Sequence, residues 1–391
     1  TIGDPIVNVS SRYSALNLGQ SRMVGFNNIE LISDRSPETN FKEIAEVKKR
    51  WPNHAVIASL MVDTRERWHE FVKRSEDAGA DGIELNFGCP HGMCERGMGS
   101  AVGQQPDVAE KIVSWVMEVA KIPVITKLTP NITDVTYAAR AAKRAGSNAI
   151  SLINTINSIT QVNLDNFCPE PFVAGLSSHG GYCGPAVKPI ALNMVQSCAA
   201  DPEVRLPISG IGGISNWRDA AEFIALGSTS VQVCTAIMHY GFRIVEDMAE
   251  GLSDYLDSKG MKSVNELIGK AVPTLQKWET LDLHYKRIAS INYDKCIGCN
   301  LCYIACEDGA HQAIALIAPN GHGLGPGRVP GKPIPEIKEH ECVGCNLCSL
   351  VCPVDECITM VSVDTKRAKM SWSDYQAKVS RGEMKPIPPH P

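Results

Sequence analysis

The sequence predicts an α/β chain in which a (β/α)8 TIM barrel is followed by a small α+β module. Three observations predict this architecture. Short apolar runs alternate with segments of helical spacing over residues 54–260, motifs of small residues follow the last two runs, and two tight cysteine runs lie near the C-terminus. We expect the barrel to span residues 1–287 and the module residues 288–362, with a tail at 363–391.

Six apolar runs are predicted to be buried parallel strands, because each is short and apolar almost throughout. They are Ala55–Met61, Gly82–Phe87, Pro123–Lys127, Ala149–Ile153, Leu206–Gly210 and Ser230–Val233. The segments between them have helical spacing, as in Thr64–Ala78, where Trp68 and Phe71 fall on one face. The others are Val108–Ala120, Val135–Ala145, Val187–Cys198, Trp217–Leu226 and Phe242–Leu256.

A closed barrel of this type needs eight strands, so two are expected ahead of Ala55. Residues 1–53 offer one helix, near Asn40–Trp51, and a loop rich in Ser, Asn and Arg. We therefore expect the chain to begin just as its second strand ends. An open doubly wound sheet is the alternative to the barrel.

Residues 261–290 are predicted to be a helical connector, and Pro319–Pro335 an exposed loop between the cysteine runs. Met370–Pro391 is expected to pack on a neighbour or to be disordered.

Composition narrows the classes of protein. The formal net charge is −5 and no stretch is strongly basic, which argues against a nucleic-acid partner. No apolar run reaches the roughly 18 residues of a membrane helix. The 15 cysteines stand in a chain too long for a secreted disulfide scaffold, which favours a reducing, cytoplasmic compartment.

The two cysteine runs have the spacing of bacterial ferredoxins with two [4Fe–4S] clusters. The runs are Cys296-x2-Cys299-x2-Cys302-x3-Cys306 and Cys342-x2-Cys345-x2-Cys348-x3-Cys352-Pro353. The fourth cysteine of each run is expected to reach the other cluster. We therefore predict Cys296, Cys299, Cys302 and Cys352 as one ligand set, and Cys342, Cys345, Cys348 and Cys306 as the second. Structural zinc is the alternative, but it usually uses two CxxC pairs and fits a third close cysteine poorly. Cys357 lies outside the pattern and is expected to be a buried apolar residue.

The last two predicted strands end in motifs that suit a phosphate. One continues into Ser209-Gly210-Ile211-Gly212-Gly213-Ile214 and the other into Val233-Cys234-Thr235-Ala236. Small residues let backbone N–H groups approach a phosphate, and barrels often bind one at these loops, although a glycine-rich turn without a ligand is the alternative. FMN suits this position, because it exchanges single electrons with the clusters and also delivers hydride. Lys127 ends a strand and is expected to place a positive charge near the flavin pyrimidine.

A long polar loop follows the second apolar run and carries Cys89, in Asn86-Phe87-Gly88-Cys89-Pro90-His91-Gly92-Met93-Cys94-Glu95-Arg96-Gly97-Met98-Gly99. A cysteine in such a loop is a candidate for an acid or base on a lid, and an ordinary turn cysteine is the alternative.

At this loop the sequence resembles the dihydropyrimidine dehydrogenase family, and most of all its bacterial FMN and iron–sulfur catalytic subunits. Asn28-Ile29-Glu30-Leu31, Lys127, Asn154-Thr155, Gly184, the Gly212-Gly213 loop and the two cysteine runs agree with it, so the resemblance covers essentially the whole chain. The barrel is similar to that of dihydroorotate dehydrogenases. In this family the first strand, with its flavin contacts, would precede Thr1.

The resemblance implies roles for individual residues. Cys89 would protonate C5 of a pyrimidine while FMN N5 gives hydride to C6. The side chains of Asn28, Asn86, Asn154 and Thr155 would hydrogen-bond the substrate, since amides match the alternating N–H and C=O groups of uracil. Residues around Lys127, Gly184, Gly212, Gly213, Cys234 and Thr235 would hold FMN. Each asparagine taken alone is equally compatible with capping or loop bonding.

The resulting expectation is reversible reduction of uracil or thymine to the 5,6-dihydropyrimidine. No Gly-x-Gly-x-x-Gly fingerprint follows a strand and opens a helix. NAD(P)H and FAD are therefore expected to bind a partner flavoprotein subunit in a hetero-oligomer, with the clusters as the path to FMN. Two alternatives remain: a dihydroorotate-type enzyme acting on another cyclic amide, and a non-catalytic electron-transfer or scaffold subunit.

Overall fold

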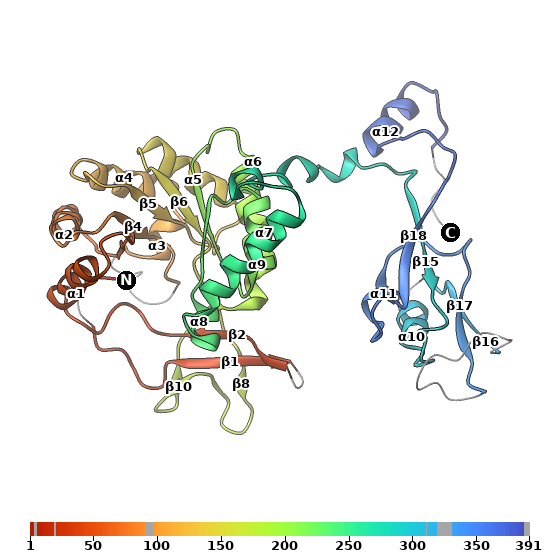
Figure 1. Cartoon of the computed structure of the whole chain (residues 1–391), viewed down its shortest axis with the longest axis horizontal. Coiled ribbons are helices and arrows are strands. Elements are labelled where there is room, and N and C mark those ends of the chain that lie inside the picture. Colours follow the sequence, from red (N-terminus) through yellow and green to blue (C-terminus); the bar gives the residue numbers. More distant parts are fainter. Residues whose placement is uncertain (4–5, 19–20, 91–96, 310, 319–330, 387–391) are drawn as a thin grey trace. The chain divides into compact units, whose positions relative to one another are not determined.

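The computed structural model describes residues 1–3, 6–18, 21–90, 97–309, 311–318 and 331–386. The chain divides into two compact units, Thr1–Leu275 and Gln276–Pro391, which are shown in Figure 1 and described separately below. The domain limits that the sequence suggests at 287/288 and 362/363 stay predictions.

The first unit is built around a six-stranded parallel sheet, and all six predicted strands are present in it. Its order is β14-β13-β6-β5-β4-β3, so each strand lies beside its neighbour in the barrel sequence. The strands are β3 (Ile57–Leu60), β4 (Gly82–Asn86), β5 (Val124–Lys127), β6 (Ala149–Leu152), β13 (Ile208–Ile211) and β14 (Ser230–Gln232). Ile2 forms a parallel bridge with Leu60, at the β3 edge. The barrel-type α/β fold is thus confirmed.

Helices follow the strands in the order that the sequence predicts, and short polar side chains begin them. Thr64 accepts a hydrogen bond from the amide of Arg67, and Asn216 accepts from Arg218 and Asp219. Helices α2, α4 and α5 lie beside the sheet in Figure 1. The helices are α1 (Pro37–Arg50), α2 (Arg65–Asp77), α3 (Ser100–Gly103), α4 (Pro106–Met117), α5 (Val135–Arg144), α6 (Lys188–Ala200), α7 (Trp217–Ala225), α8 (Thr235–Tyr240) and α9 (Ile244–Ser258), with the 3-10 turn η2 (Pro185–Val187).

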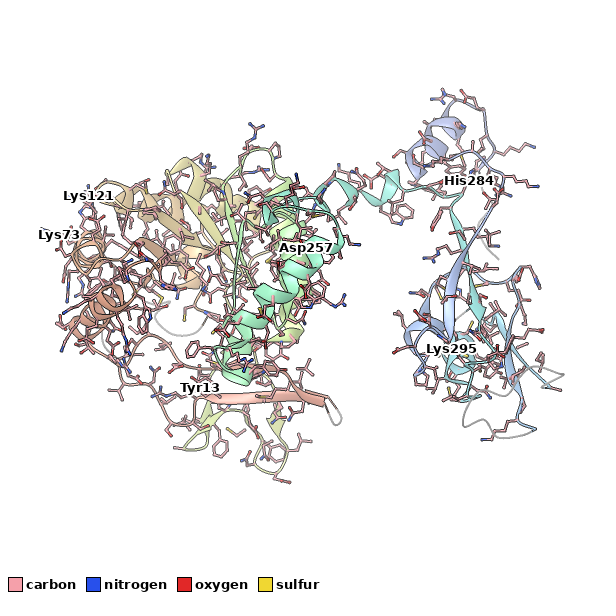
Figure 2. The ribbon with its side chains drawn as sticks, in the orientation of Figure 1. Tyr13, Lys73, Lys121, Asp257, His284 and Lys295 are labelled. Carbon is pink, nitrogen blue, oxygen red and sulfur yellow. The ribbon has the colours of Figure 1, made fainter. Side chains whose placement is uncertain are left out.

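The inward and outward faces of these helices differ as their spacing predicts. Trp68 and Phe71 of α2 are fully buried against Phe87 and the β3–β4 part of the sheet. Lys73 of the same helix and Lys121, just beyond α4, are exposed on the outside of the unit (Figure 2). Burial of one apolar face per helix therefore holds the layer on the sheet.

The prediction of a loop over much of residues 1–53 is wrong. Residues 13–18 and 21–28 form an antiparallel pair, β1 (Tyr13–Leu18) and β2 (Ser21–Asn28), which belongs to a second sheet of order β1-β2-β12-β7 (Figure 1). The other members are β7 (Ile156–Ser158) and β12 (Gly180–Cys183). Gly181 of β12 pairs with Asn28 of β2. The partner strand of β2 therefore comes from the segment inserted after β6, more than 150 residues away, and the local sequence gives no sign of it.

Small ribbons follow β7 in the same inserted segment. They are β8 (Val162–Asn163) paired with β9 (Cys168–Pro169), and β10 (Phe172–Val173) paired with β11 (Leu176–Ser177). Their strands are short and leave Leu164, Phe167 and Leu176 mostly exposed.

The second unit contains two antiparallel pairs and two helices that each begin within a cysteine run. The pairs are β15 (Lys286–Ile291) with β18 (Ile358–Val363), and β16 (Ile314–Ile317) with β17 (Ile334–Ile337). The helices are α10 (Leu301–Asp308) and α11 (Leu347–Leu350). Most of the predicted loop Pro319–Pro335, namely 319–330, lies outside the described residues, and Ile334 and Pro335 belong to β17.

The expectation of a helical connector is wrong. Residues 261–290 are not a continuous helix but the 3-10 turns η3 (Val264–Glu266), η4 (Val272–Thr274) and η5 (Trp278–Thr280), followed by the start of β15. The tail contains α12 (Trp372–Ser380), opened by a capping box between Ser371 and Asp374, and its Trp372 ring contacts Trp278. Among the described residues we find no helix with the length and apolarity needed to cross a membrane.

Candidate functional site

A cavity of about 440 Å³ opens where the parallel strands end. Its wall combines the C-terminal ends of β5, β6, β13 and β14 with the polar sheet β1-β2-β12, the arrangement in which barrel enzymes place their sites. Nine of the predicted site residues line it: Asn28, Lys127, Asn154, Thr155, Gly184, Gly212, Gly213, Cys234 and Thr235. Residues more than 200 positions apart in the sequence therefore meet in one pocket.

Glycines form a cradle on one wall of this pocket. Gly213 has φ +76°, and a Cβ there would lie 2.8 Å from the carbonyl oxygen of Gly184. Gly184 has φ +97° and lies against the backbone of Gly25. The amide of Ser215 donates to buried Asp219 at 2.8 Å, which fixes the loop after β13. This backbone-lined surface fits a phosphate group, because small residues leave room for one.

Alanine at Gly213 is expected to damage this cradle. The substitution places a Cβ in a left-handed conformation and against Gly184, at a cost of about 1–3 kcal/mol. We expect the dissociation constant for FMN to rise at least about tenfold, measured by flavin fluorescence titration. Gly175→Ala is the matched control, since Gly175 has φ +84° but open space around it. Equal FMN affinity in the two variants would contradict a ligand-binding role for the cradle.

The predicted substrate residues meet on another wall. The side chain of Asn154 donates to Asn86 Oδ1 at 2.8 Å, and Asn154 Oδ1 accepts from the amide of Thr155 at 2.8 Å. Asn28 donates to the carbonyl of Gly181 at 3.2 Å. Asn86 itself is 8% exposed and is not among the lining residues, so the structure places it behind Asn154.

Sequence reasoning missed Asn131, which supports this wall. Its side chain donates to the carbonyl of Thr155 at 3.2 Å and accepts from the amide of Asn157 at 2.8 Å. Asn131 follows the Thr-Pro pair after β5, a polar position at a strand end that could have suggested it.

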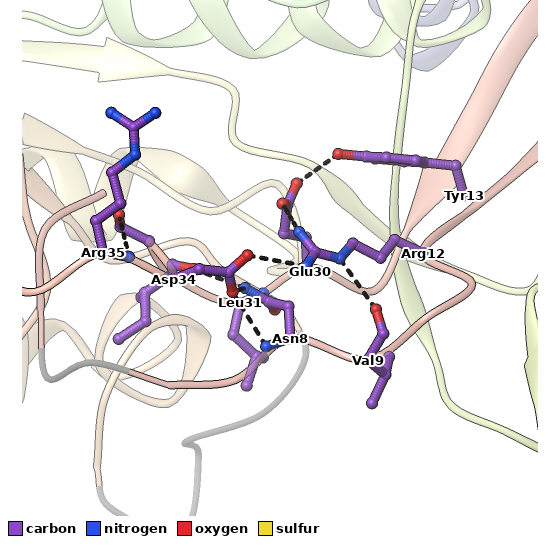
Figure 3. A network of polar contacts seen from close by, with 10 residues as sticks. Asn8, Val9, Arg12, Tyr13, Glu30, Leu31, Asp34 and Arg35 are labelled. Atoms are coloured by element: carbon purple, nitrogen blue, oxygen red, sulfur yellow. Dashed lines mark hydrogen bonds and ion pairs between the residues drawn. The ribbon is translucent and has the colours of Figure 1, made fainter.

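A charged network that the sequence did not reveal lies at the rim of the pocket (Figure 3). Arg12 pairs with Glu30 at 2.7 Å and with Asp34 at 2.8 Å, and the Tyr13 hydroxyl donates to Glu30. Hydrogen bonding to Glu30, together with burial, raises the pKa of Tyr13 to about 12. Asn8 donates to Asp34 and to the carbonyl of Ile32.

This network fixes the end of β2 and the segment after it, where Asn28, Glu30 and Leu31 all line the pocket. Hydrogen bonds from Asn8 are the main cause of a lowered pKa at Asp34, with a further contribution from Arg12. Arg12 and Asp34 are too far apart in the sequence for a local pattern to indicate that they form an ion pair, so the network could not be predicted.

Cys89 is the one predicted catalytic residue, and the structure does not bring it into the pocket wall. It is 6% exposed and packs among Ile32, Met61 and Met98. Its carbonyl accepts from the amide of Ser100 at 3.0 Å. The remainder of its loop, 91–96, lies outside the described residues.

The eight cysteines of the two runs surround two small cavities in the second unit. Cys296, Cys299, Cys302 and Cys352 line one cavity, and Cys306, Cys342, Cys345 and Cys348 line the other. The crosswise sets are those that the spacing predicts, and four thiolates are the donor set of a [4Fe–4S] cluster. Within the described ranges, no three His, Cys, Asp or Glu side chains are arranged to hold a single metal ion. Cys357 is buried, as expected, but also lines the first cavity.

The two runs adopt the same backbone conformation. Gly298 and Gly344 have φ +69° and +73°, and Asn300 and Asn346 are both left-handed, with φ +60° and +71°. A helix begins directly after each asparagine. Both loops therefore turn their cysteines inward in the same way.

Comparison with known proteins agrees with both units. Residues 11–256 match the dihydroorotate dehydrogenase family model, and residues 289–360 match the 4Fe-4S dicluster domain. The chain is 43% identical, over 80% of its length and 77% of the relative, to the NAD-dependent dihydropyrimidine dehydrogenase subunit PreA of Escherichia coli K12. The chain belongs to the dihydropyrimidine dehydrogenase family.

Two further relatives define the range of the similarity. The chloroplastic dihydropyrimidine dehydrogenase (NADP(+)) of Arabidopsis thaliana is 40% identical over 68% of this chain and 65% of its own length. The catalytic subunit of dihydroorotate dehydrogenase B (NAD(+)) from Pyrococcus abyssi is 39% identical over 59% of this chain and 73% of its own. As a member of the dihydropyrimidine dehydrogenase family, the chain is an oxidoreductase that joins a flavin-type barrel to an iron–sulfur module.

Proposed function

We propose that this chain reduces uracil or thymine to the 5,6-dihydropyrimidine on FMN. Electrons come from NAD(P)H through a partner flavoprotein subunit and two [4Fe–4S] clusters, in the cytoplasm. The observation that carries the proposal is the pocket itself. One cavity holds a glycine cradle, a lysine and a cluster of amide side chains, which suit a phosphate, a flavin and a cyclic imide respectively.

FMN, when bound, supplies hydride to C6 of the pyrimidine and takes up electrons one at a time. The backbone around Gly184, Gly212 and Gly213 would hold its phosphate, because glycines leave backbone N–H groups accessible to an anion in the pocket. Cys234 and Thr235 line the same pocket. Lys127 would place a positive charge beside the reduced ring.

The asparagines would bind and orient the pyrimidine. Uracil presents N–H donors beside C=O acceptors, and an amide side chain offers both functions. Asn28, Asn154 and Thr155 reach the cavity, while Asn86 holds the amide of Asn154 through the bond at 2.8 Å. Asn86 would thereby orient Asn154 as well as contact the substrate.

Cys89 would donate the proton that C5 needs once hydride has reached C6. The hydride and this proton together balance the reduction of the C5=C6 bond. Cys89 lies at the start of the loop after β4 and packs in one cluster with Ile32, which lines the pocket. That position supports delivery from the loop side of the pocket.

The partner subunit would bind NAD(P)H and FAD, since the sequence has no dinucleotide fingerprint in its βα context. The Escherichia coli relative is named a subunit, which supports a hetero-oligomer. The two crosswise cysteine sets would hold the clusters that carry electrons in single steps.

Comparison of flavin reductants tests the substrate class. Protein reconstituted with FMN is mixed anaerobically with dihydrouracil, dihydrothymine or dihydroorotate, and bleaching of the flavin is followed. We expect dihydrouracil or dihydrothymine to bleach it at least about tenfold faster than dihydroorotate, which corresponds to about 1.4 kcal/mol. Faster reduction by dihydroorotate would contradict the proposal, and protein that holds iron but no flavin would indicate an electron-transfer subunit.

The dihydroorotate alternative draws support from the family model over residues 11–256. Orotate carries a carboxylate that uracil lacks, and a carboxylate is usually bound by a cationic side chain. Lys127 is the only lysine or arginine among the described pocket-lining residues, and it pairs with Glu84. This pairing favours the neutral pyrimidine.

A further inference from the structure

A buried carboxylate lies behind the floor of the pocket and has no role in the chemistry described above. Glu84 is the middle residue of β4 and is 5% exposed, in a strand whose five residues are all buried. Its neighbours Ile83 and Leu85 belong to the apolar core under the helices. Because side chains alternate along a strand, Glu84 points to the opposite face, the barrel interior.

Three partners from three other strands satisfy this carboxylate. Lys127 Nζ lies 3.3 Å from Glu84 Oε1, and Ser151 Oγ and Gln232 Nε2 donate to Oε2 at 2.9 Å and 3.2 Å. Gln232 also donates to Ser209 at 3.1 Å. A buried carboxylate is tolerated when it is paired and hydrogen-bonded in this way.

Strand register explains why these groups meet. Across the sheet, Asn86 is the partner of Lys127, Lys127 of Ser151, and Ser151 of Ser209. Side chains paired in parallel strands point to the same face. The sheet therefore builds one polar row across the barrel interior, with Glu84 one pleat below Asn86.

Lys127 and Gln232 line the pocket, whereas Glu84 does not. Glu84 therefore contacts both Lys127 and Gln232 from the side away from the cavity. A positive charge beside a flavin stabilises its reduced anionic form, and a carboxylate next to that charge reduces the effect.

We propose that Glu84 is a positioning residue that holds Lys127 and Gln232 at the pocket floor and lowers the reduction potential of the bound flavin. The inference rests on the proposed function only in that the pocket must hold FMN. Glu84 would thus set the reduction potential of the flavin without lining the cavity.

The test is the midpoint potential of bound FMN, measured by anaerobic dye-linked titration of the full chain. In Glu84→Gln the charge of Lys127 is unopposed, so the ratio of reduced to oxidised flavin at a fixed potential should rise at least tenfold, which is about 30 mV for a two-electron couple. Lys127→Gln should lower that ratio. The double variant Glu84→Gln/Lys127→Gln, with a neutral pair, should return to within about threefold of wild type.

Ser151→Ala is the matched control, because it removes one hydrogen bond to the same carboxylate without changing charge. A ratio in Glu84→Gln that is unchanged or lowered would overturn the inference. If Glu84→Gln does not retain FMN, the double variant is compared with Lys127→Gln: a higher ratio of reduced to oxidised flavin in the double variant supports the inference, and an equal or lower ratio contradicts it. Wild-type protein that takes up no FMN would count against the proposed function, whereas a flavin whose potential ignores Glu84 counts against this inference alone.

Discussion

Cys89→Ala is expected to reduce uracil about 100 to 10,000 times more slowly than the wild-type protein, the usual contribution of a positioned general acid. The thiol would supply the proton for C5, and alanine leaves no group to replace it. Steady-state reduction of uracil under anaerobic conditions measures the effect. Reduction of the flavin by the electron donor should keep its wild-type rate, because Cys89 has no part in electron input.

Cys168→Ala is the matched control for this variant. Cys168 and Cys89 are both 6% exposed, but Cys168 lies in the ribbon after β8, away from the lining of the pocket. Both substitutions remove one buried thiol, so any general cost of that loss appears in both. Turnover of Cys89→Ala within about threefold of the control would show that another group provides the proton.

Cys296→Ala should separate electron delivery from pyrimidine chemistry. Loss of one of four ligands is expected to remove one cluster and reduce the iron content from about eight to about four atoms per chain. We expect turnover driven by NAD(P)H and the partner subunit to fall at least about 100-fold. Chemically reduced flavin in the same variant should still be oxidised by uracil at the wild-type rate, since the barrel is unchanged.

Cys357→Ala provides the comparison, because Cys357 is also buried and lines the same cavity as Cys296. It stands outside the eight-cysteine pattern, so both clusters and full turnover should be retained. Equal iron loss in the two variants would contradict the assignment of ligands by spacing. Full NAD(P)H-driven turnover in Cys296→Ala would contradict the cluster path itself.

The parallel sheet could be predicted from sequence because its strands are buried on both faces. A short run such as Ala149–Ile153, apolar except for Ser151, is a local signal for a buried strand, and the structure places β6 within it. The sheet formed by β1, β2, β12 and β7 could not, because it depends on contacts between distant segments. Gly181 pairs with Asn28, and Ser14 bonds to Thr160 at 2.7 Å.

The same distinction applies to the residues of the candidate site. Residues at strand ends, such as Lys127 and Gly213, were predictable because the barrel fold itself directs ligands there. Arg12 and Glu84 were not, since each acts through a partner that only the folded chain brings near. Cys89 was singled out by its loop, but its burial beside Met61 and Met98, outside the lining of the pocket, depends on contacts between distant segments.

Counting electrons tests the central claim most directly. FMN stores two electrons and each cluster one, so a fully reduced chain holds about four, enough for about two dihydropyrimidine molecules. Photoreduced protein, free of excess reductant, is mixed anaerobically with uracil, and dihydrouracil is counted per chain by mass spectrometry. We expect about two molecules, with the flavin and both clusters oxidised together. No dihydrouracil, or one molecule with the clusters left reduced, would contradict a pyrimidine reductase supplied with electrons through its iron–sulfur module.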